Sequence, residues 1–226
     1  MVALVPPDRP ADLRTVTGYR VAMAATQMGL RARKKQATST ALQRSAIDLF
    51  LERGYDETTV QDITDAAGVS QRTFFRYYPT KADAVWGDFA GHVARLESLL
   101  AATDQARPVL ASVCAAYVEV NDYPDAELPL LRERMRLILG EPALLAHSQL
   151  RFAEVDRGVA RYVAARTAAS PTDLVPRLVA ASTRAAATTA FQAWLADERS
   201  ALTEHLHQTF DEMAAGFPSL RSRPGM

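Results

Sequence analysis

Side chains that can hydrogen-bond to base edges or to phosphate oxygens gather between Thr59 and Lys81, in the stretch TVQDITDAAGVSQRTFFRYYPTK. Arg72 can donate two hydrogen bonds to guanine, and Gln71 can pair with adenine. Thr73 offers a hydroxyl group to phosphate and a methyl group to thymine. Residues of these types, placed close together, predict a surface that binds double-stranded DNA.

Two short helices joined by a tight turn are expected to position these side chains. Gly68 ends the first helix, because glycine readily adopts the left-handed conformation that follows a helix end. Ser70 can cap a second helix over residues 71–78, and Pro79 ends it. Such a pair is a helix-turn-helix, whose second helix enters the major groove. The apolar residues at helical spacing in the first helix are Val60, Ile63, Ala66 and Ala67.

The order of residues from Leu42 to Trp86 resembles the DNA-binding domain of the TetR family of one-component bacterial regulators. The resemblance implies DNA contacts by Thr59 and Gln61 near the start of the second helix of the DNA-binding domain. It also implies that Lys81, at the start of the fourth helix, meets phosphate. Phe75 stands where the family commonly has a tyrosine; its ring can pack on sugar or a thymine methyl group but cannot donate to phosphate. The candidate DNA contacts are Thr59, Gln61, Ser70, Gln71, Arg72, Thr73, Phe75, Arg76, Tyr77 and Lys81.

Less specific interpretations of the charged residues stay open. Arg72, Arg76 and Lys81 can be ordinary solvated charges in a helical protein whose glycine turn arose by chance. A short basic arm precedes the first helix, and it either keeps the chain soluble or touches phosphates or a minor groove. The arm consists of Arg31, Arg33, Lys34 and Lys35.

Charge and composition predict an all-α protein in which positive charge is local. The net charge is +0, but residues 28–82 hold nine Lys/Arg against six Asp/Glu, a balance of +3. DNA binding requires a positive face and not a positive total. Residues 1–37 are expected to be a disordered tail with the basic arm, 38–82 a three-helix DNA-binding unit, 83–216 a helical ligand-binding and dimerisation domain, and 217–226 a tail. Met28 is an alternative start of the native protein.

Helical patterning and punctuation by glycine and proline predict the elements outside the helix-turn-helix. The first helix is expected over residues 40–53, where Gly54 ends it, and the next helix begins with Thr58 or Thr59 as its cap and Asp62 as the acidic partner. Phe74 and Tyr78 are four residues apart and are expected to face the small core. Later helices are expected over 81–102, 107–121, 127–139, 142–168, 171–196 and 198–215.

The second half resembles the regulatory part of the same family only in helical character and length. The sequence FFRYYPTKADAVWGDF is similar to the actinobacterial branch whose effectors are acyl-CoA-like, so a small apolar or acyl-type effector is expected. Arg132, Arg134 and Arg136 could attract an anionic ligand, but at alternate positions on a helix they cannot all share one face, so most of them are expected to be solvated or paired. Candidate effector contacts, each of which could equally be ordinary core, are Phe89, Val93, Tyr117, Met135, Leu139, Phe152 and Trp194.

The last two long helices are the expected homodimer surface. Residues 178–195 combine small side chains, which allow close helix approach, with Phe191 and Trp194 as aromatic anchors. A two-fold dimer predicts a roughly palindromic operator. The alternative is that this segment is buried within one subunit.

No catalytic constellation, metal site or cofactor motif is predicted. His205 and His207 are two residues apart on a predicted helix, so their rings point to different sides. Cys114, the only cysteine, cannot form an internal disulfide and is expected to be a small apolar residue. No apolar run approaches the ~20 residues that span a bilayer, and the start lacks the pattern of a signal peptide, so the cytoplasm is expected.

These observations together predict a ligand-responsive repressor that an effector releases from a palindromic operator. An activator or a regulator of its own gene is an alternative within the same family. A helical enzyme with an accidental helix-turn-helix would turn over a substrate and show no salt-sensitive DNA binding. A helical partner-binding protein with a decayed DNA-binding unit would dimerise but bind no operator. The effector, the operator and the target genes cannot be identified from the sequence.

Overall fold

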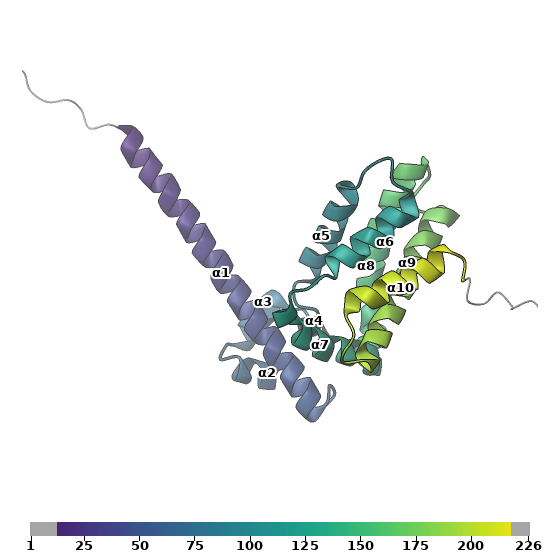
Figure 1. Cartoon of the computed structure of the whole chain (residues 1–226). Coiled ribbons are helices and arrows are strands. Elements are labelled where there is room, and N and C mark those ends of the chain that lie inside the picture. Colours follow the sequence, from purple (N-terminus) through teal and green to yellow (C-terminus); the bar gives the residue numbers. More distant parts are fainter. Residues whose placement is uncertain (1–12, 218–226) are drawn as a thin grey trace, which may run out of the picture.

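The computed structural model describes residues 13–217, and the side chains of residue 29 and of residues 33–217. Every regular element in that range is a helix, which confirms the predicted all-α class. The helices are α1 Leu13–Arg53, α2 Val60–Ala66, α3 Gln71–Tyr77, α4 Lys81–Trp86, α5 Phe89–Ala101, α6 Val109–Val120, the short 3-10 helix η1 Asp125–Glu127, α7 Leu128–Gly140, α8 Pro142–Thr167, α9 Leu174–Ala196 and α10 Leu202–Ala214 (Figure 1).

The first helix begins much earlier than the sequence patterning predicts. It starts at Leu13 instead of Thr40, so the part of the expected tail over residues 13–37 is helical. No proline lies between Leu13 and Arg53, and extending an existing helix costs far less than starting one. Residues 1–12 of the expected tail lie outside the described range, as do residues 218–226.

The single helix predicted over residues 81–102 is also wrong, because it divides at Gly87. The backbone of Gly87 has φ 58° and ψ −131°, which a helix cannot contain. Asp88 then caps α5 by accepting a hydrogen bond from the backbone N–H of Gly91. The remaining predicted helices agree with the structure to within a few residues at each end.

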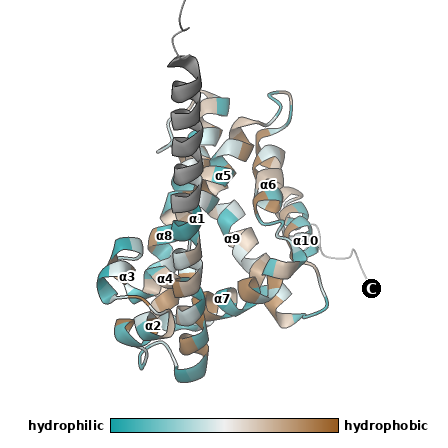
Figure 2. Cartoon of the chain, turned by 90° about the vertical axis from the view of Figure 1, so that its left-hand side faces the viewer, coloured by the Kyte–Doolittle hydropathy of each residue, from teal (hydrophilic) through white to brown (hydrophobic). Residues whose placement is uncertain are grey.

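The end of α1 packs with α2, α3 and α4, and this part of the chain, residues 38–86, is called the reading unit below. Leu42, Ile47, Ile63 and Phe74 are fully buried there. Tyr78 is buried with them, and its hydroxyl group hydrogen-bonds to Ser39 of α1 at 2.7 Å. Figure 2 shows hydrophilic residues on the outward side of α3, so this helix offers a polar face to solvent.

In the second half of the chain, residues 89–214, helices α5 to α10 pack around the rest of the buried apolar cluster. Here α9 packs against both α8 and α10, and α5 packs against α6 and α8. Its buried centre includes Leu96, Val113, Val159 and Leu206. Among the described helices, none combines the length and apolar character required to cross a bilayer.

Candidate DNA-reading surface and effector cavity

Local caps fix the two helices of the predicted helix-turn-helix. Thr59 and Asp62 form a capping box: the backbone N–H of Thr59 donates to the Asp62 carboxylate at 2.8 Å, and the backbone N–H of Asp62 donates to the Thr59 hydroxyl at 3.1 Å. Hydrogen bonds from Thr59 lower the pKa of Asp62. Gly68 has φ 66°, and Ser70 caps α3 through the backbone N–H of Thr73. The sequence signals for both helix starts are therefore confirmed.

The candidate contacts on α3 lie on the face that points away from the core. Gln71, Arg72 and Arg76 are exposed, and Phe75 is 53% exposed although it is a large apolar residue. Phe74 and Tyr78 are buried, as the sequence predicts. An exposed aromatic ring on a polar helix face is suited to packing on sugar or on a thymine methyl group.

A chain of side-chain hydrogen bonds joins α2 to α3 across the outer surface of the turn. The amide N–H of Gln71 donates to the side-chain oxygen of Gln61 at 2.6 Å, and the amide of Gln61 donates to Asp65 at 2.6 Å. These bonds hold both glutamines in a defined orientation beside Arg72. Asp65 is not among the residues predicted to contact DNA, but through these hydrogen bonds it orients two of them, Gln61 and Gln71.

Lys81 has a structural position that its place in the sequence does not reveal. Its ammonium group donates to the backbone carbonyl oxygens of Tyr55 at 2.7 Å, Thr58 at 3.0 Å and Asp56 at 3.3 Å. The same nitrogen lies 4.2 Å from the centre of the Tyr55 ring. All three N–H donors thus fasten the start of α4 to the turn between α1 and α2. A phosphate contact of Lys81 stays a prediction.

A buried carboxylate connects α4 with α8 of the second half. Asp83 is 5% exposed, and its carboxylate accepts hydrogen bonds from Thr80 at 2.8 Å and Arg151 at 2.5 Å. His147 Nε2 lies 3.2 Å from the same carboxylate. Burial alone would raise the pKa of Asp83, but the hydrogen bonds from Thr80 and Arg151 outweigh it and lower the pKa. This cluster is a polar link between the reading unit and the helices behind it.

A cavity of about 390 Å³ lies among α1, α4, α5, α6, α7, α8 and α9. Five of the seven candidate effector contacts line it: Phe89, Tyr117, Met135, Leu139 and Phe152. Val93 and Trp194 do not. Trp194 is buried outside the cavity, where the guanidinium carbon of Arg132 lies 3.9 Å from its ring centre.

Polar groups occupy part of the cavity wall. Arg134, Arg95 and His92 line it, and in the described part of the chain Arg134 makes no ion pair. Burial, with the nearby Arg134 and Arg95, lowers the pKa of His92 to about 4. Arg132 and Arg136 point elsewhere: Arg132 donates to the carbonyl of Trp194, and Arg136 pairs with Glu198.

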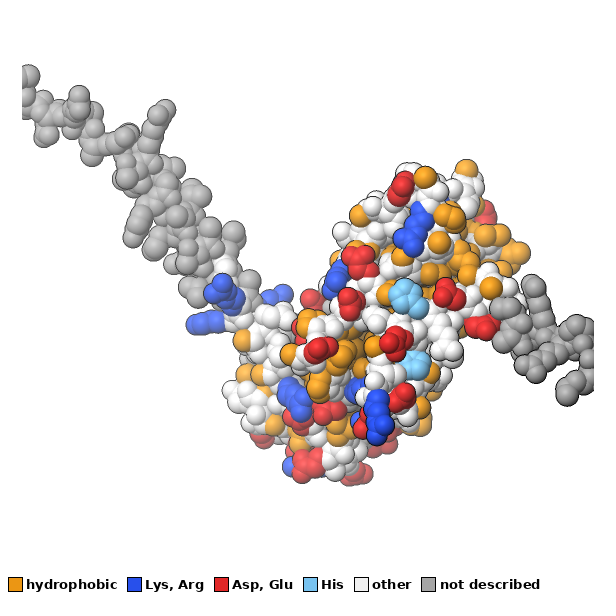
Figure 3. Space-filling model, viewed as in Figure 1, with side chains coloured by type: hydrophobic (Ala, Val, Ile, Leu, Met, Phe, Trp, Pro, Cys, Tyr) orange, Lys and Arg blue, Asp and Glu red, His pale blue; other side chains and the backbone are white. Residues whose placement is uncertain are grey.

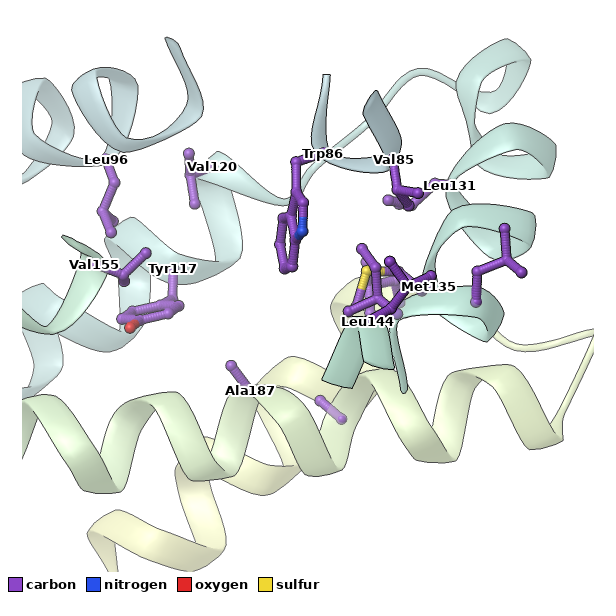
Figure 4. Packing of buried hydrophobic residues seen from close by; sticks show 14 of the residues in the cluster. Val85, Trp86, Leu96, Tyr117, Val120, Leu131, Met135, Leu144, Val155 and Ala187 are labelled. Atoms are coloured by element: carbon purple, nitrogen blue, oxygen red, sulfur yellow. The ribbon is translucent and has the colours of Figure 1, made fainter. Parts of the chain in front are cut away.

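Two buried polar groups in the wall lack good partners among the described residues. The indole Nε1 of Trp86 makes no hydrogen bond there. The Tyr117 hydroxyl lies near the side chain of Thr183 but makes no hydrogen bond of normal geometry with it, and burial raises the pKa of Tyr117. Both residues also belong to the buried apolar cluster shown in Figure 4.

The reading unit itself contributes to the cavity wall. Gln36 and Gln43 of α1 line it, together with Trp86 at the end of α4. The amide of Gln43 donates to the backbone carbonyl of Val85 at 3.0 Å. A Cβ atom on Gly87 would lie 2.5 Å from the end of the Gln43 side chain, which would have to shift, and the positive φ of Gly87 also favours glycine. None of these polar contacts has a local sequence signal, because their partners are about 40 residues apart.

The outer surface has no extended region of one charge sign on the face that Figure 3 shows, where basic and acidic side chains alternate. Positive charge is instead available at particular positions, such as Arg72 and Arg76 on α3. No group of three or more His, Cys, Asp or Glu side chains that could hold a metal ion occurs within residues that the structure describes.

Two family models match this chain. Residues 43–84 match the model described as bacterial regulatory proteins, tetR family, and residues 107–218 match the model described as MftR C-terminal domain. A protein of Mycobacterium tuberculosis, named as a candidate mycofactocin biosynthesis transcriptional regulator MftR, is 37% identical over 188 residues, which are 83% of this chain and 95% of that protein.

Two further proteins extend the comparison. The HTH-type transcriptional regulator TcmR of Streptomyces glaucescens is 32% identical over 177 residues, or 74% of this chain and 76% of that protein. The crystal structure of Thermus thermophilus FadR, a repressor in complex with lauroyl-CoA, has a similar fold with a TM-score of 0.51 and 22% identity. The similarity covers 83% of this chain and 98% of FadR.

Proposed function

This chain belongs to the TetR family of bacterial transcriptional regulators, and from that premise we propose that it is a homodimeric repressor, released from a palindromic operator by an acyl-type effector. Ligand-responsive DNA binding is the function of the family, whereas the sign of regulation, the operator symmetry and the effector class belong to the proposal. A bacterial regulator meets its DNA in the cytoplasm, so that is the proposed location. Members are regulators, and we propose no catalysis.

One observation carries the proposal: the cavity is walled on one side by the reading unit. Gln43 of α1 and Trp86 of α4 face the same space as Met135 and Phe152 of the second half. A ligand that fills this space must contact both halves of the chain. Such a ligand can have different affinities for the operator-bound and the free arrangement of the reading units, which is the requirement for effector control.

The lining supports an effector with an apolar body and an anionic group. Aromatic and aliphatic side chains make up most of the wall, and Arg134 and Arg95 lie beside them without carboxylate partners among the described residues. A volume of about 390 Å³ is within the usual range of small-molecule sites. The lauroyl-CoA bound by the similar FadR protein is a molecule of this type.

The proposed dimer surface is the exposed side of α9, with α10 beside it. Leu174, Val175 and Leu178 are 78%, 55% and 58% exposed at the start of α9. Exposed apolar residues that cluster in this way are typical of protein interfaces. Ala181 and Ala185 continue the same exposed side with small residues, which allow close helix approach.

The first experiment is a genome-wide DNA pull-down with the purified protein, followed by titration of the best site at two salt concentrations. We expect a palindromic site bound far more tightly than random DNA. Arg72→Ala should weaken operator binding by ~1–3 kcal/mol if Arg72 reads a guanine. Arg199→Ala, an exposed arginine between α9 and α10, is the matched control and should leave affinity unchanged.

The effector part is tested by adding lauroyl-CoA to the operator complex. Release of the operator, with no release by coenzyme A alone, is the expected result. Weak, sequence-blind binding that salt abolishes would contradict a repressor that acts without a co-ligand. Specific operator binding that no acyl compound alters would contradict only the effector class.

A further inference from the structure

We infer that the indole N–H of Trp86 is a specificity-determining donor of the effector cavity, and that the effector presents a hydrogen-bond acceptor such as a carbonyl oxygen to it. The inference rests on the proposed function and adds a requirement to it. An acyl-type effector could be recognised by its apolar body and anionic group alone. The inferred donor distinguishes a neutral carbonyl group from a hydrocarbon of the same shape.

The first support is the burial of an unpaired donor. Trp86 is 7% exposed, and its Nε1 has no hydrogen-bond partner in the described part of the chain. A buried N–H without an acceptor costs about 1–3 kcal/mol, and native structures contain few of them. Trp86 lines the cavity, and a ligand that displaces the side chains packed over Nε1 would supply the missing acceptor.

The second support is the apolar surroundings of that donor. The ring of Phe89 lies 5.0 Å from the Trp86 ring, and the ring of Phe152 lies 5.8 Å away, both edge to face. Figure 4 shows the indole extending from α4 toward the space between Tyr117 and Met135, which line the same cavity. A hydrogen bond in such a low-dielectric site discriminates strongly between ligands with and without an acceptor.

The third support is the place of Trp86 in the chain. It is the last residue of α4, between Val85, whose carbonyl accepts from Gln43 of α1, and Gly87, where the helix breaks. A ligand that bonds to the Trp86 indole therefore contacts α4, the last helix of the reading unit, directly before the regulatory helices. Trp86 can in this way both select the ligand and respond to it.

Trp194 provides an internal comparison, because the chain has only two tryptophans. Its Nε1 is also buried and unpaired among the described residues, but its ring lies under Arg132 and outside the cavity. Trp194→Phe thus removes the same group at a residue that does not line the cavity, although the Trp194 ring packs against Phe191, which does.

The test compares two probe ligands on three proteins. The probes are methyl heptyl ketone and its isosteric alkene, in which a methylene group replaces the carbonyl oxygen. The proteins are wild type, Trp86→Phe and Trp194→Phe, and the dissociation constants are measured by calorimetry. The alkene affinity reports any loosening of the cavity, so the ketone-to-alkene ratio isolates the hydrogen bond even if Trp86→Phe is less stable.

We expect wild type and Trp194→Phe to bind the ketone about tenfold more tightly than the alkene, and Trp86→Phe to bind the two equally. In Trp194→Phe, where Trp86 is the only tryptophan, ketone binding should also shift the tryptophan emission. That emission change gives the result without Trp86→Phe, should the variant fail to fold.

Three outcomes overturn the inference. If wild type binds the ketone and the alkene with equal affinity, the ligand does not accept a hydrogen bond from the indole. If Trp86→Phe still binds the ketone more tightly than the alkene, another group donates to the carbonyl oxygen. If neither probe binds wild type, the cavity is not an apolar ligand site, and the proposed effector site fails with the inference. If the ketone ratio is as expected but no acyl compound alters operator binding, the proposed function fails while the Trp86 donor stands.

Discussion

The ammonium group of Lys81 shows how one side chain can be assigned two roles that exclude each other. Its donors bind the carbonyl oxygens of Tyr55, Asp56 and Thr58, so the group that the family resemblance directs at phosphate is already occupied. Hydrogen bonds that involve a charged group contribute about 1.5–3 kcal/mol each in favourable cases. At the scale of the residue, the competing roles differ in what their removal should change.

Lys81→Met should lower the free energy of unfolding by about 1–3 kcal/mol, because three backbone carbonyl oxygens lose their donor while most of the aliphatic stem remains. Urea denaturation followed by circular dichroism measures this. Arg72→Ala, whose side chain is exposed, is the control and should leave stability unchanged. Unchanged stability with a loss of operator affinity would assign Lys81 to phosphate instead.

His92 predicts a pH dependence of stability with a definite sign. Its folded pKa is about 4, below the ~6.5 of an unfolded histidine, so between these values the unfolded chain binds more protons. The free energy of unfolding should therefore fall as the pH drops from about 6.5 toward 4. His92→Gln should reduce that fall, and His207→Gln, an exposed histidine, should not. Identical pH profiles for the two variants would contradict the assignment.

At the scale of the element, the break between α4 and α5 depends on Gly87. Its positive φ disfavours any other residue, and an added Cβ would strike the Gln43 side chain. Gly87→Ala should destabilise the protein by about 1–3 kcal/mol. Gly140→Ala, where a Cβ meets nothing within 4 Å, is the matched control and should be neutral or slightly stabilising.

The source of the Gly87 penalty can be divided by a second substitution. Gln43→Ala in the same chain removes the clash but leaves the positive φ, so the double variant should recover part of the stability lost in Gly87→Ala. Thermal denaturation of the four proteins gives the interaction free energy. A double variant that is no more stable than additivity predicts would mean that backbone conformation alone requires glycine.

Short-range signals made the reading unit predictable at this scale. Thr59 with Asp62, Gly68, and Ser70 each act within a few residues of the turn, and the structure contains each of them. The break at Gly87 was not predicted, although the sequence carries a signal for it: a glycine followed by an aspartate cap interrupts the helical pattern of residues 81–102. The long α1 had none, because helix extension depends on propagation and not on a marked start.

The cavity illustrates what could not be predicted. Five aromatic or aliphatic lining residues were found because apolar positions at helical spacing face inward. Gln43 and His92 were not predicted, and Arg134 was predicted only as one of three arginines, since polar residues reach a cavity only through the packing of helices distant in sequence. The same limit explains Trp194, which lies outside the cavity although Ala187 and Phe191 of the same helix line it.

At the scale of the whole molecule, the proposed dimer would bring two reading units to successive major grooves. Leu178→Glu places a charge on the exposed apolar side of α9. A buried unpaired charge costs about 3 kcal/mol or more, so the dimer dissociation constant should rise about a hundredfold. Analytical ultracentrifugation measures this. Leu51→Glu at the end of α1, also an exposed leucine, should leave the dimer intact. A Leu178→Glu protein that stays dimeric would move the interface elsewhere.

The wall that α1 shares with the cavity has a consequence for the effector as well as for the operator. Gln43 and Trp86 belong to the reading unit and yet border the proposed effector cavity. Coupling between two binding sites is reciprocal, so on the proposed function an operator duplex must weaken effector binding by the same factor by which the effector weakens operator binding. The effector concentration needed for release is then set by the weaker effector affinity of the operator-bound protein. Protein that is not bound to DNA has a higher affinity for the effector and binds it at lower concentrations.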